Sequence, residues 1–260
     1  MVIFDQLVYV PVYNLLIFVY NLLPFQDFGI AIIVITLIIK FLLIPLSRKQ
    51  IESQKKMTEL QPKIKELQKK YKDDKEKQSR ALMELYKTNK SNPFSGCLPM
   101  IVQLVFLIAI YRVLFNISQA NLMVEGNILY GFIQNPGQID KMFLGLIDLS
   151  TAVNLGEITL AEMPKIILVI LAALSQFFQS KMLMAKQKTA ASPQSNEKMD
   201  FSQMLSKQML ILGPLLTLFI GIKFPSGLAL YWLVSTVFMI IQQYFLEKEI
   251  KLTSSPKQIK

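Results

Sequence analysis

Five runs of apolar residues dominate the pattern of hydrophobic and polar positions along this chain of 260 residues. Each run is long enough to supply most or all of a helix that crosses the hydrocarbon core of a bilayer, which takes roughly 20 apolar residues. The runs cover residues 28–46, 93–116, 165–183, 208–222 and 228–246. The pattern therefore predicts an all-α integral membrane protein with five transmembrane helices.

The N-terminal segment, residues 1–27, is also apolar, but Pro11, Asn14 and Asn21 interrupt it. Proline and unpaired amides are costly inside a membrane helix, so we expect an amphipathic helix that lies in the outer membrane interface. The segment lacks the basic region and cleavage site of a secretory signal, so we expect it in the mature protein. A sixth transmembrane helix is the alternative.

The segment of residues 47–92 follows another pattern, in which apolar residues recur at alternating intervals of three and four. That spacing is typical of a helix that packs against a partner helix. It runs through Met57, Leu60, Ile64, Leu67 and Tyr71, stops at "YKDDKEK", and resumes at Gln78, Ala81, Leu82 and Leu85. We expect a helical hairpin whose two antiparallel helices are joined near Asp73 and Asp74.

The distribution of Lys and Arg predicts which segments face the cytoplasm. Residues 47–92 contain fourteen of them, and residues 184–207 and the tail 247–260 contain four each. The loop 117–164 has only Lys141, together with five acidic residues. Because basic loops remain inside, we expect the hairpin, residues 184–207 and the C-terminal tail in the cytoplasm, and the N-terminus and loop 117–164 outside.

Composition narrows the classes of function. Apolar residues make up 52% of the chain and the mean hydropathy is +0.40, which is too hydrophobic for an ordinary soluble domain. The chain has no histidine, and Cys97 is its only cysteine. Histidine-based acid–base chemistry, histidine-based zinc chemistry and intrachain disulfides are therefore excluded. Most enzyme classes therefore lack their usual catalytic groups here, and we expect no cofactor and no metal ion.

A few polar residues lie within the predicted transmembrane helices and form the candidate site. Thr36 and Lys40 are four residues apart, so they share one face of the first helix. If the polar faces of several helices converge, they line a partly hydrated cavity. The candidate residues are Thr36, Lys40, Gln103, Gln176, Gln179 and Trp232.

Several of these residues have a second interpretation. Lys40 lies six residues before Leu46, so its side chain can instead extend toward the membrane surface. Gln103 can form hydrogen bonds that hold two helices together, and Trp232 can be an interfacial anchor. Two further basic residues, Arg112 and Lys223, lie near the outward ends of helices, and we expect both to contact lipid headgroups.

The sequence alone leaves more than one class of function open. No Asp or Glu lies within the five predicted transmembrane helices, which argues against a proton-coupled transporter. A solute transporter or channel remains one alternative. A membrane-anchored scaffold that recruits ribosomes is another, because the basic hairpin would attract the phosphates of RNA or of anionic lipids.

Four separated stretches resemble the YidC family of bacterial membrane protein insertases, which are related to insertases of mitochondria and thylakoids. These are "ITLIIKFLLIPLSRKQ", "LQPKIKELQKKY", "NPFSGCLPMIVQ" and "FPSGLALYWLVSTVFMIIQQ". They occur in the order and spacing of that family, and the resemblance extends from about Phe28 to Leu246.

The resemblance implies a core of five helices around a hydrophilic groove that is open to the cytoplasm and to lipid. It also implies one positive charge in the groove, at the position of Lys40. The family usually has arginine there, and lysine lacks the planar fork of donors of arginine. Thr36, Gln103 and Trp232 correspond to groove positions, whereas Val105 replaces a proline that is frequent in the family.

The function implied by the resemblance is the insertion, and assisted folding, of nascent membrane proteins in the bacterial plasma (inner) membrane. The groove would let a hydrophilic segment leave water without entering bare hydrocarbon. The implied partners are nascent membrane proteins, the ribosome and anionic lipids, with the Sec translocon as a further candidate. The substrates, the dependence on Sec and the oligomeric state remain open.

Overall fold

The computed structural model describes residues 2–89, 91, 98–119, 124–189 and 201–254. These residues form two compact units, which are described separately. The bundle unit comprises Met1–Leu42, Gln103–Gln179 and Ile211–Lys260. The hairpin unit comprises Leu43–Val102 and Ser180–Leu210.

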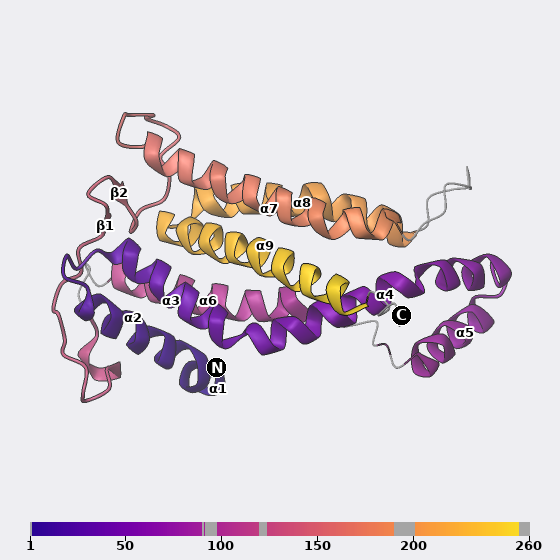
Figure 1. The fold of residues 1–260 in the computed structure, drawn as a ribbon. Helices are drawn as coiled ribbons and strands as arrows, with labels where there is room; N and C mark the ends of the chain where they lie inside the picture. The colour runs from indigo at the N-terminus through magenta and orange to yellow at the C-terminus, as the bar shows by residue number, and fades with distance from the viewer. Residues whose placement is uncertain (1, 90, 92–97, 120–123, 190–200, 255–260) are drawn as a thin grey trace. The chain divides into compact units, whose positions relative to one another are not determined.

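The described residues are mostly helical, as predicted, with one short two-stranded sheet (Figure 1). The longer helices are α2 (Val10–Leu22), α3 (Phe28–Leu42), α4 (Ile44–Lys70), α5 (Lys75–Thr88), α6 (Leu98–Gln119), α7 (Met163–Thr189), α8 (Phe201–Lys223) and α9 (Ser226–Ser254). The shorter elements are α1 (Val2–Phe4), the π-helix η1 (Asp5–Tyr9), the 3-10 helix η3 (Gly126–Ile128) and the strands β1 (Met142–Phe143) and β2 (Ile147–Asp148).

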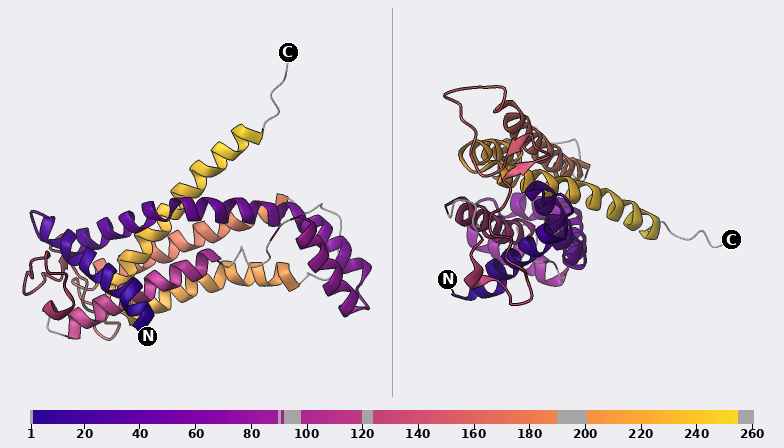
Figure 2. Two further views of the ribbon diagram at one scale, coloured as in Figure 1. Left: turned by 90° about the horizontal axis from the view of Figure 1, so that it is seen from below. Right: turned by 90° about the vertical axis from the view of Figure 1, so that its left-hand side faces the viewer.

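Helix α9 is central in the bundle unit, because its residues contact α3, α6 and α7. In Figure 1 it lies between α7 on one side and α3 and α6 on the other, and in Figure 2 its C-terminal part extends beyond these helices. Its Phe238 packs edge to face on Phe41 of α3, with ring centroids 5.2 Å apart. A Cβ atom on Gly227 would lie 3.0 Å from the Leu114 side chain of α6. A glycine at this position therefore permits the close approach of α9 to α6.

The N-terminal helix α2 packs on the loop between α6 and α7, whose described part is residues 124–162. Its buried face includes Tyr13, which is fully buried, and the Tyr13 hydroxyl accepts a hydrogen bond from the Glu125 backbone N–H at 2.8 Å. Asn14 bonds the backbone of the same loop through both its oxygen and its nitrogen. Asn14 and Asn21, the two amides that interrupt the apolar pattern, thus form hydrogen bonds with the loop backbone.

The β1–β2 hairpin of this loop rests on the start of α3. Strands β1 and β2 are antiparallel, with Phe143 opposite Ile147. The Phe143 ring covers Gly29, where any Cβ atom would overlap it at 2.2 Å. Asp27 caps α3 by accepting from the Ile30 N–H at 2.9 Å, and its second oxygen accepts from the Leu144 N–H at 2.6 Å. One carboxylate therefore joins the helix to the loop.

The hairpin unit contains the predicted helical hairpin. Helices α4 and α5 are joined through residues 71–74, close to the predicted Asp73 and Asp74. Leu60 and Ile64 on the predicted apolar face are buried, and Gln78 of α5 donates to the backbone oxygen of Gln68 at 2.9 Å. Asp74 caps α5 by accepting from the Lys77 N–H at 2.9 Å. This carboxylate has a lowered pKa because of hydrogen bonds from Lys77.

Four helical stretches among the described residues are long and apolar enough to cross a membrane: Val2–Leu22, Ile101–Ser118, Met163–Met182 and Ser226–Leu246. Helix α3 adds a fifth if it is counted with α4 as one broken span. Leu210–Lys223 is apolar but shorter. The N-terminal segment is thus as long and apolar as three of the predicted spans require. Its position in the membrane interface stays a prediction.

Several predicted boundaries differ from the helices. The span predicted over 28–46 is interrupted, because α3 ends at Leu42 and α4 begins at Ile44. Pro45 lacks an N–H and its ring would clash with the backbone of a continuous helix. Helix α9 continues to Ser254, so the predicted tail 247–260 begins as helix. Residues 93–97 of the second span and residues 190–200 of the predicted loop 184–207 lie outside the described residues.

Candidate functional site

Lys40, near the end of α3, reaches across to α6 and contacts Gln103. Its Nζ donates a hydrogen bond to Gln103 Oε1 at 2.8 Å. The Ser235 hydroxyl of α9 donates to the same oxygen at 3.0 Å. One amide oxygen therefore accepts hydrogen bonds from two other helices and joins α3, α6 and α9. We call Lys40, Gln103 and Ser235 the lysine cluster.

The amide nitrogen of Gln103 has a different environment. Gln103 Nε2 is buried and has no hydrogen-bond partner in the part of the chain that the structure describes. Leaving such a donor unpaired costs about 1–3 kcal/mol. The buried Tyr231 side chain adjoins the cluster, with its hydroxyl in hydrogen-bonding reach of Ser235 and Gln103. Gln103 Nε2 is thus a buried donor that lies beside the Tyr231 hydroxyl.

A second polar cluster joins α7 to α9. Trp232 Nε1 donates to Gln176 Oε1 at 3.1 Å, and the Thr236 hydroxyl lies 3.5 Å from the same oxygen. We call Trp232, Gln176 and Thr236 the tryptophan cluster. One turn further along α7, Gln179 Nε2 lies 3.6 Å from the sulfur of Met239. The Gln176 amide oxygen thus accepts from side chains of α9, as the Gln103 oxygen does, whereas the Gln179 amide donates.

Thr36, the remaining predicted residue, is fully buried. Its hydroxyl donates to the backbone oxygen of Ile32, one turn earlier, at 2.6 Å. This local bond satisfies a buried hydroxyl within its own helix. Thr36 shares a face of α3 with Lys40 as predicted, but its hydroxyl bonds the backbone of its own helix and not the lysine cluster.

Four of the six predicted residues thus form two pairs, Lys40 with Gln103 and Trp232 with Gln176. Sequence reasoning missed the residues of α9 that connect the two pairs. Tyr231, Ser235 and Thr236 are buried polar residues of α9 that were not among the candidates. Ser235 and Thr236 lie three and four residues after Trp232, which is one helical turn. A search for polar side chains one turn from a candidate would have found both.

The electrostatic surroundings of Lys40 differ from those of Arg112, Lys141 and Lys165 in the bundle unit. Arg112 forms an ion pair with Asp5 and stacks on the Tyr9 ring, so its partners in the structure are protein groups. The contact of Arg112 with lipid headgroups stays a prediction. Lys141 pairs with Asp148 at 2.7 Å and Lys165 with Glu162 at 2.8 Å. Among the described residues, no carboxylate forms an ion pair with Lys40, whose partner is the neutral Gln103.

This arrangement favours binding an acidic or polar group over chemical catalysis. The lysine cluster offers a cation beside one amide and one hydroxyl group. No group of three or more His, Cys, Asp or Glu side chains gathers among the described residues in a way that would hold a metal ion. A carboxylate is the ligand that best matches one ammonium and one N–H donor.

The fold and site define a multi-pass α-helical membrane protein with polar clusters between its helices. The family described as "60Kd inner membrane protein" matches residues 18–254, and the chain belongs to that family. This confirms the resemblance to the YidC family that the four sequence stretches indicated. The family is not an enzyme family in the usual sense.

Curated relatives are each named "Membrane protein insertase YidC". The relative from Citrifermentans bemidjiense is 35% identical over 225 residues, which are 86% of this chain and 34% of the relative. The relative from Geobacter sulfurreducens is 34% identical over 225 residues, with the same coverage. The relative from Rickettsia massiliae is 32% identical over 226 residues, which are 85% of this chain and 36% of the relative.

The chain therefore spans about a third of the length of these relatives. The family and the apolar helices place it among multi-pass proteins of the bacterial inner membrane.

Proposed function

We propose that this chain inserts nascent membrane proteins into the bacterial inner membrane and helps them fold. Membership of the family and the names of the relatives support this proposal. The proposed groove is lined by the six predicted residues, Thr36, Lys40, Gln103, Gln176, Gln179 and Trp232, together with Ser235 and Thr236.

The observation that carries the proposal is the isolated positive charge of Lys40. A basic residue within a membrane protein is normally paired, as Arg112, Lys141 and Lys165 are here. Lys40 instead contacts a neutral amide. An amide fixes the position of the ammonium group without neutralising its charge. The charge thus remains available to attract an acidic group of a client.

The proposed mechanism lowers the barrier to moving a polar segment into the membrane. An acidic residue at the centre of a bilayer costs about 2.5–3.5 kcal/mol on insertion scales. Attraction to Lys40 and a hydrogen bond from Gln103 would offset part of that cost while the segment crosses. The apolar helix of the client would then move into lipid. No covalent bond forms or breaks, so the activity is not enzymatic.

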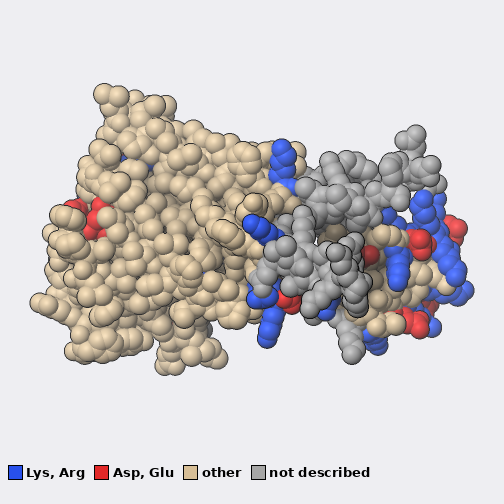
Figure 3. Space-filling model, in the orientation of Figure 1, with Lys and Arg blue, Asp and Glu red and all other residues tan. Residues whose placement is uncertain are grey.

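The proposed partners follow from the charge of the hairpin unit. Its surface carries many Lys and Arg side chains with interspersed acids (Figure 3). We place this unit in the cytoplasm, where it would contact the ribosome and anionic lipid headgroups. The Sec translocon is a further proposed partner. The N-terminus lies outside and the C-terminus lies inside in this proposal.

The proposal can be tested with the purified chain in proteoliposomes. A newly synthesised single-span client with an acidic translocated tail is added, and protection of its tail from protease is measured. We expect protection with the chain and none in empty liposomes. Flux of ions and small solutes is measured in the same vesicles, and flux without client protection would favour a transporter or channel.

A further inference from the structure

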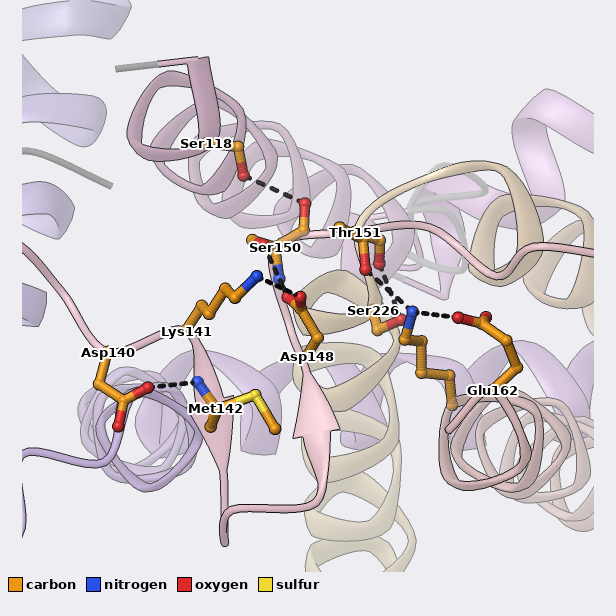
Figure 4. Close-up of polar contacts among 10 residues, drawn as sticks. Ser118, Asp140, Lys141, Met142, Asp148, Ser150, Thr151, Glu162 and Ser226 are labelled. Atoms are coloured by element: carbon orange, nitrogen blue, oxygen red, sulfur yellow. Dashed lines mark hydrogen bonds and ion pairs between the residues drawn. The ribbon is translucent and has the colours of Figure 1, made fainter. Parts of the chain in front are cut away.

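A short segment of the α6–α7 loop contacts three helices, α6, α7 and α9. Helices α7 and α9 carry the tryptophan cluster, and α6 and α9 carry two residues of the lysine cluster. This segment, residues 148–151, begins with the last residue of strand β2 (Figure 4). We call it the anchor segment. Its contacts with α9, α7 and α6 are each made by a different group.

The contact with α9 uses two carbonyl oxygens. Thr151 O accepts from the Ser226 backbone N–H at 2.9 Å and from the Ser226 hydroxyl at 3.0 Å. Leu149 O accepts from the Gly227 N–H at 3.0 Å. The first N–H groups of a helix have no partner within the helix. The anchor segment therefore caps α9 at its N-terminus.

The contact with α7 uses the Thr151 side chain. Lys165 Nζ donates to Thr151 Oγ1 at 2.9 Å and to Glu162 Oε1 at 2.8 Å. Lys165 is 6% exposed, so its charge depends on these acceptors. The second Glu162 oxygen accepts from the Asn154 N–H at 2.9 Å. One residue, Thr151, thus links α7 through its hydroxyl and α9 through its carbonyl.

The remaining bonds join α6 and stiffen the segment itself. The Ser118 hydroxyl of α6 donates to Ser150 O at 3.2 Å. Asp148 Oδ1 accepts from the Ser150 N–H at 2.9 Å and from its hydroxyl at 2.6 Å. Lys141 pairs with the other Asp148 oxygen at 2.7 Å. The bonds of Asp148 lie within the loop, as Figure 4 shows.

We propose that Thr151 is a positioning residue for the candidate site, acting through α7 and α9. Ser226 precedes Trp232 by six residues, or roughly 9 Å along the helix, and Lys165 precedes Gln176 by eleven, or roughly 16 Å. Because both helices are fixed at Thr151, the bond between Trp232 and Gln176 is held in register. An effect of this register on the insertion of clients rests on the proposed function. The register itself is a property of the fold and does not depend on that function.

Trp232 is the only tryptophan of the chain, so its fluorescence reports directly on this register. The test uses the full chain in lipid nanodiscs and the variant Thr151→Val, which removes the hydroxyl and keeps the shape and the backbone carbonyl. We expect a red shift of Trp232 emission and a larger acrylamide quenching constant. Thr151→Ser restores the hydroxyl, and we expect it to restore the wild-type spectrum.

Lys141→Met provides the matched control, since it removes a bond to the same segment that does not join α7 to α9. We expect its spectrum to match the wild type. An unchanged spectrum in Thr151→Val, or an equal shift in Lys141→Met, would overturn the proposal. If Thr151→Val does not fold, Ser226→Ala weakens the link to α9 instead, and the same shift is expected. The measurement needs no client, so its result is independent of insertion activity.

Discussion

Ser235 and Thr236 are neighbours on α9, yet their hydroxyl groups approach amides on two different helices. Ser235 donates to Gln103 of α6 at 3.0 Å, whereas Thr236 lies 3.5 Å from the oxygen of Gln176 on α7. Successive residues of a helix are about 100° apart around its axis, so one helix can serve two polar clusters. Helix α9 thereby connects the lysine cluster to the tryptophan cluster.

The first prediction concerns the neutral partner of Lys40. In Gln103→Glu, the side chain keeps its size but becomes a carboxylate, which would form a permanent ion pair with Lys40. A charged hydrogen bond contributes about 1.5–3 kcal/mol, so we expect insertion of an acidic client to slow about tenfold or more. Protease protection of the client in proteoliposomes measures this rate.

Gln103→Met is the size-matched control, because it removes the amide and leaves Lys40 charged. We expect it to retain more activity on the acidic client than Gln103→Glu does. If both variants lose the same activity, the amide itself is what the client needs, and the free charge of Lys40 is not the cause.

The second prediction concerns the packing of the helical hairpin. Leu60 is 7% exposed on α4, whereas Met83 is 54% exposed on α5. Replacing a buried leucine even by alanine costs about 2–5 kcal/mol, and Leu60→Asp also buries a charge. We expect hydrogen exchange over residues 50–88 to accelerate strongly in Leu60→Asp and little in Met83→Asp. Equal exchange in the two variants would contradict the packing of α4 on α5.

The third prediction concerns the pH dependence of the contact between Glu162 and Lys165. Hydrogen bonds from Lys165 and from the Asn154 N–H lower the pKa of Glu162. The unfolded value is about 4.3, so the stabilisation is complete above that pH and is lost as the pH falls through the lower folded pKa. We expect the melting temperature of the wild type to exceed that of Glu162→Gln at pH 7 and to lose this advantage below pH ~4. A constant difference across this range would contradict the expectation.

Much of the fold was predictable because membrane burial and helix pairing impose strong periodic patterns. The alternating spacing around Leu60 and Ile64 predicted the face along which α4 packs on α5. The break at Leu43 was missed, although Pro45 lies in the sequence, because the apolar run continues through it. The β1–β2 hairpin was also missed, since its turn at Leu144 and Gly145 depends on tertiary contacts with α3.

The candidate site was predictable in part. Lys40 and Gln103 could be selected because polar groups are rare in apolar helices, and the structure places them in direct contact. The sequence pattern of a single helix does not determine which other helices it contacts. The division of the polar residues into two clusters therefore could not be predicted. Ser235 and Thr236 were overlooked because small hydroxyl residues also satisfy themselves within a helix, as Thr36 does.

The fourth prediction concerns the topology. Cysteines are introduced one at a time as Asn127→Cys, Lys72→Cys and Val2→Cys in a Cys97→Ser background. If the hairpin is cytoplasmic and the α6–α7 loop is outside, a membrane-impermeant maleimide added to intact cells should label position 127 but not position 72. Labelling at position 2 distinguishes the two alternatives for the N-terminal helix. Labelling in intact cells supports an interfacial helix, whereas labelling only after the cells are lysed supports a sixth transmembrane helix.

The last prediction tests whether the charge of Lys40 serves the client or only extends toward the membrane surface. If the charge attracts acidic segments, Lys40→Arg should retain insertion, Lys40→Ala should slow it, and Lys40→Glu should slow it most, because like charges then repel in a medium of low dielectric constant. Losing an interaction of about 1.5–3 kcal/mol corresponds to roughly a ten- to hundredfold slower rate. A lysine that only extends toward the surface predicts that Lys40→Ala is neutral or stabilising.

Two clients distinguish these outcomes: one with an acidic translocated tail and one in which each tail acid is replaced by its amide. Both are followed by protease protection in cells depleted of the native protein that carry each Lys40 variant. We expect Lys40→Ala to impair the acidic client selectively, because only that client presents a charge for the ammonium group to attract. Equal insertion of both clients by Lys40→Ala and by wild type would exclude the electrostatic role. Equal loss of both would show that Lys40 acts by hydrating or shaping the site, since the amide tail has no charge to lose.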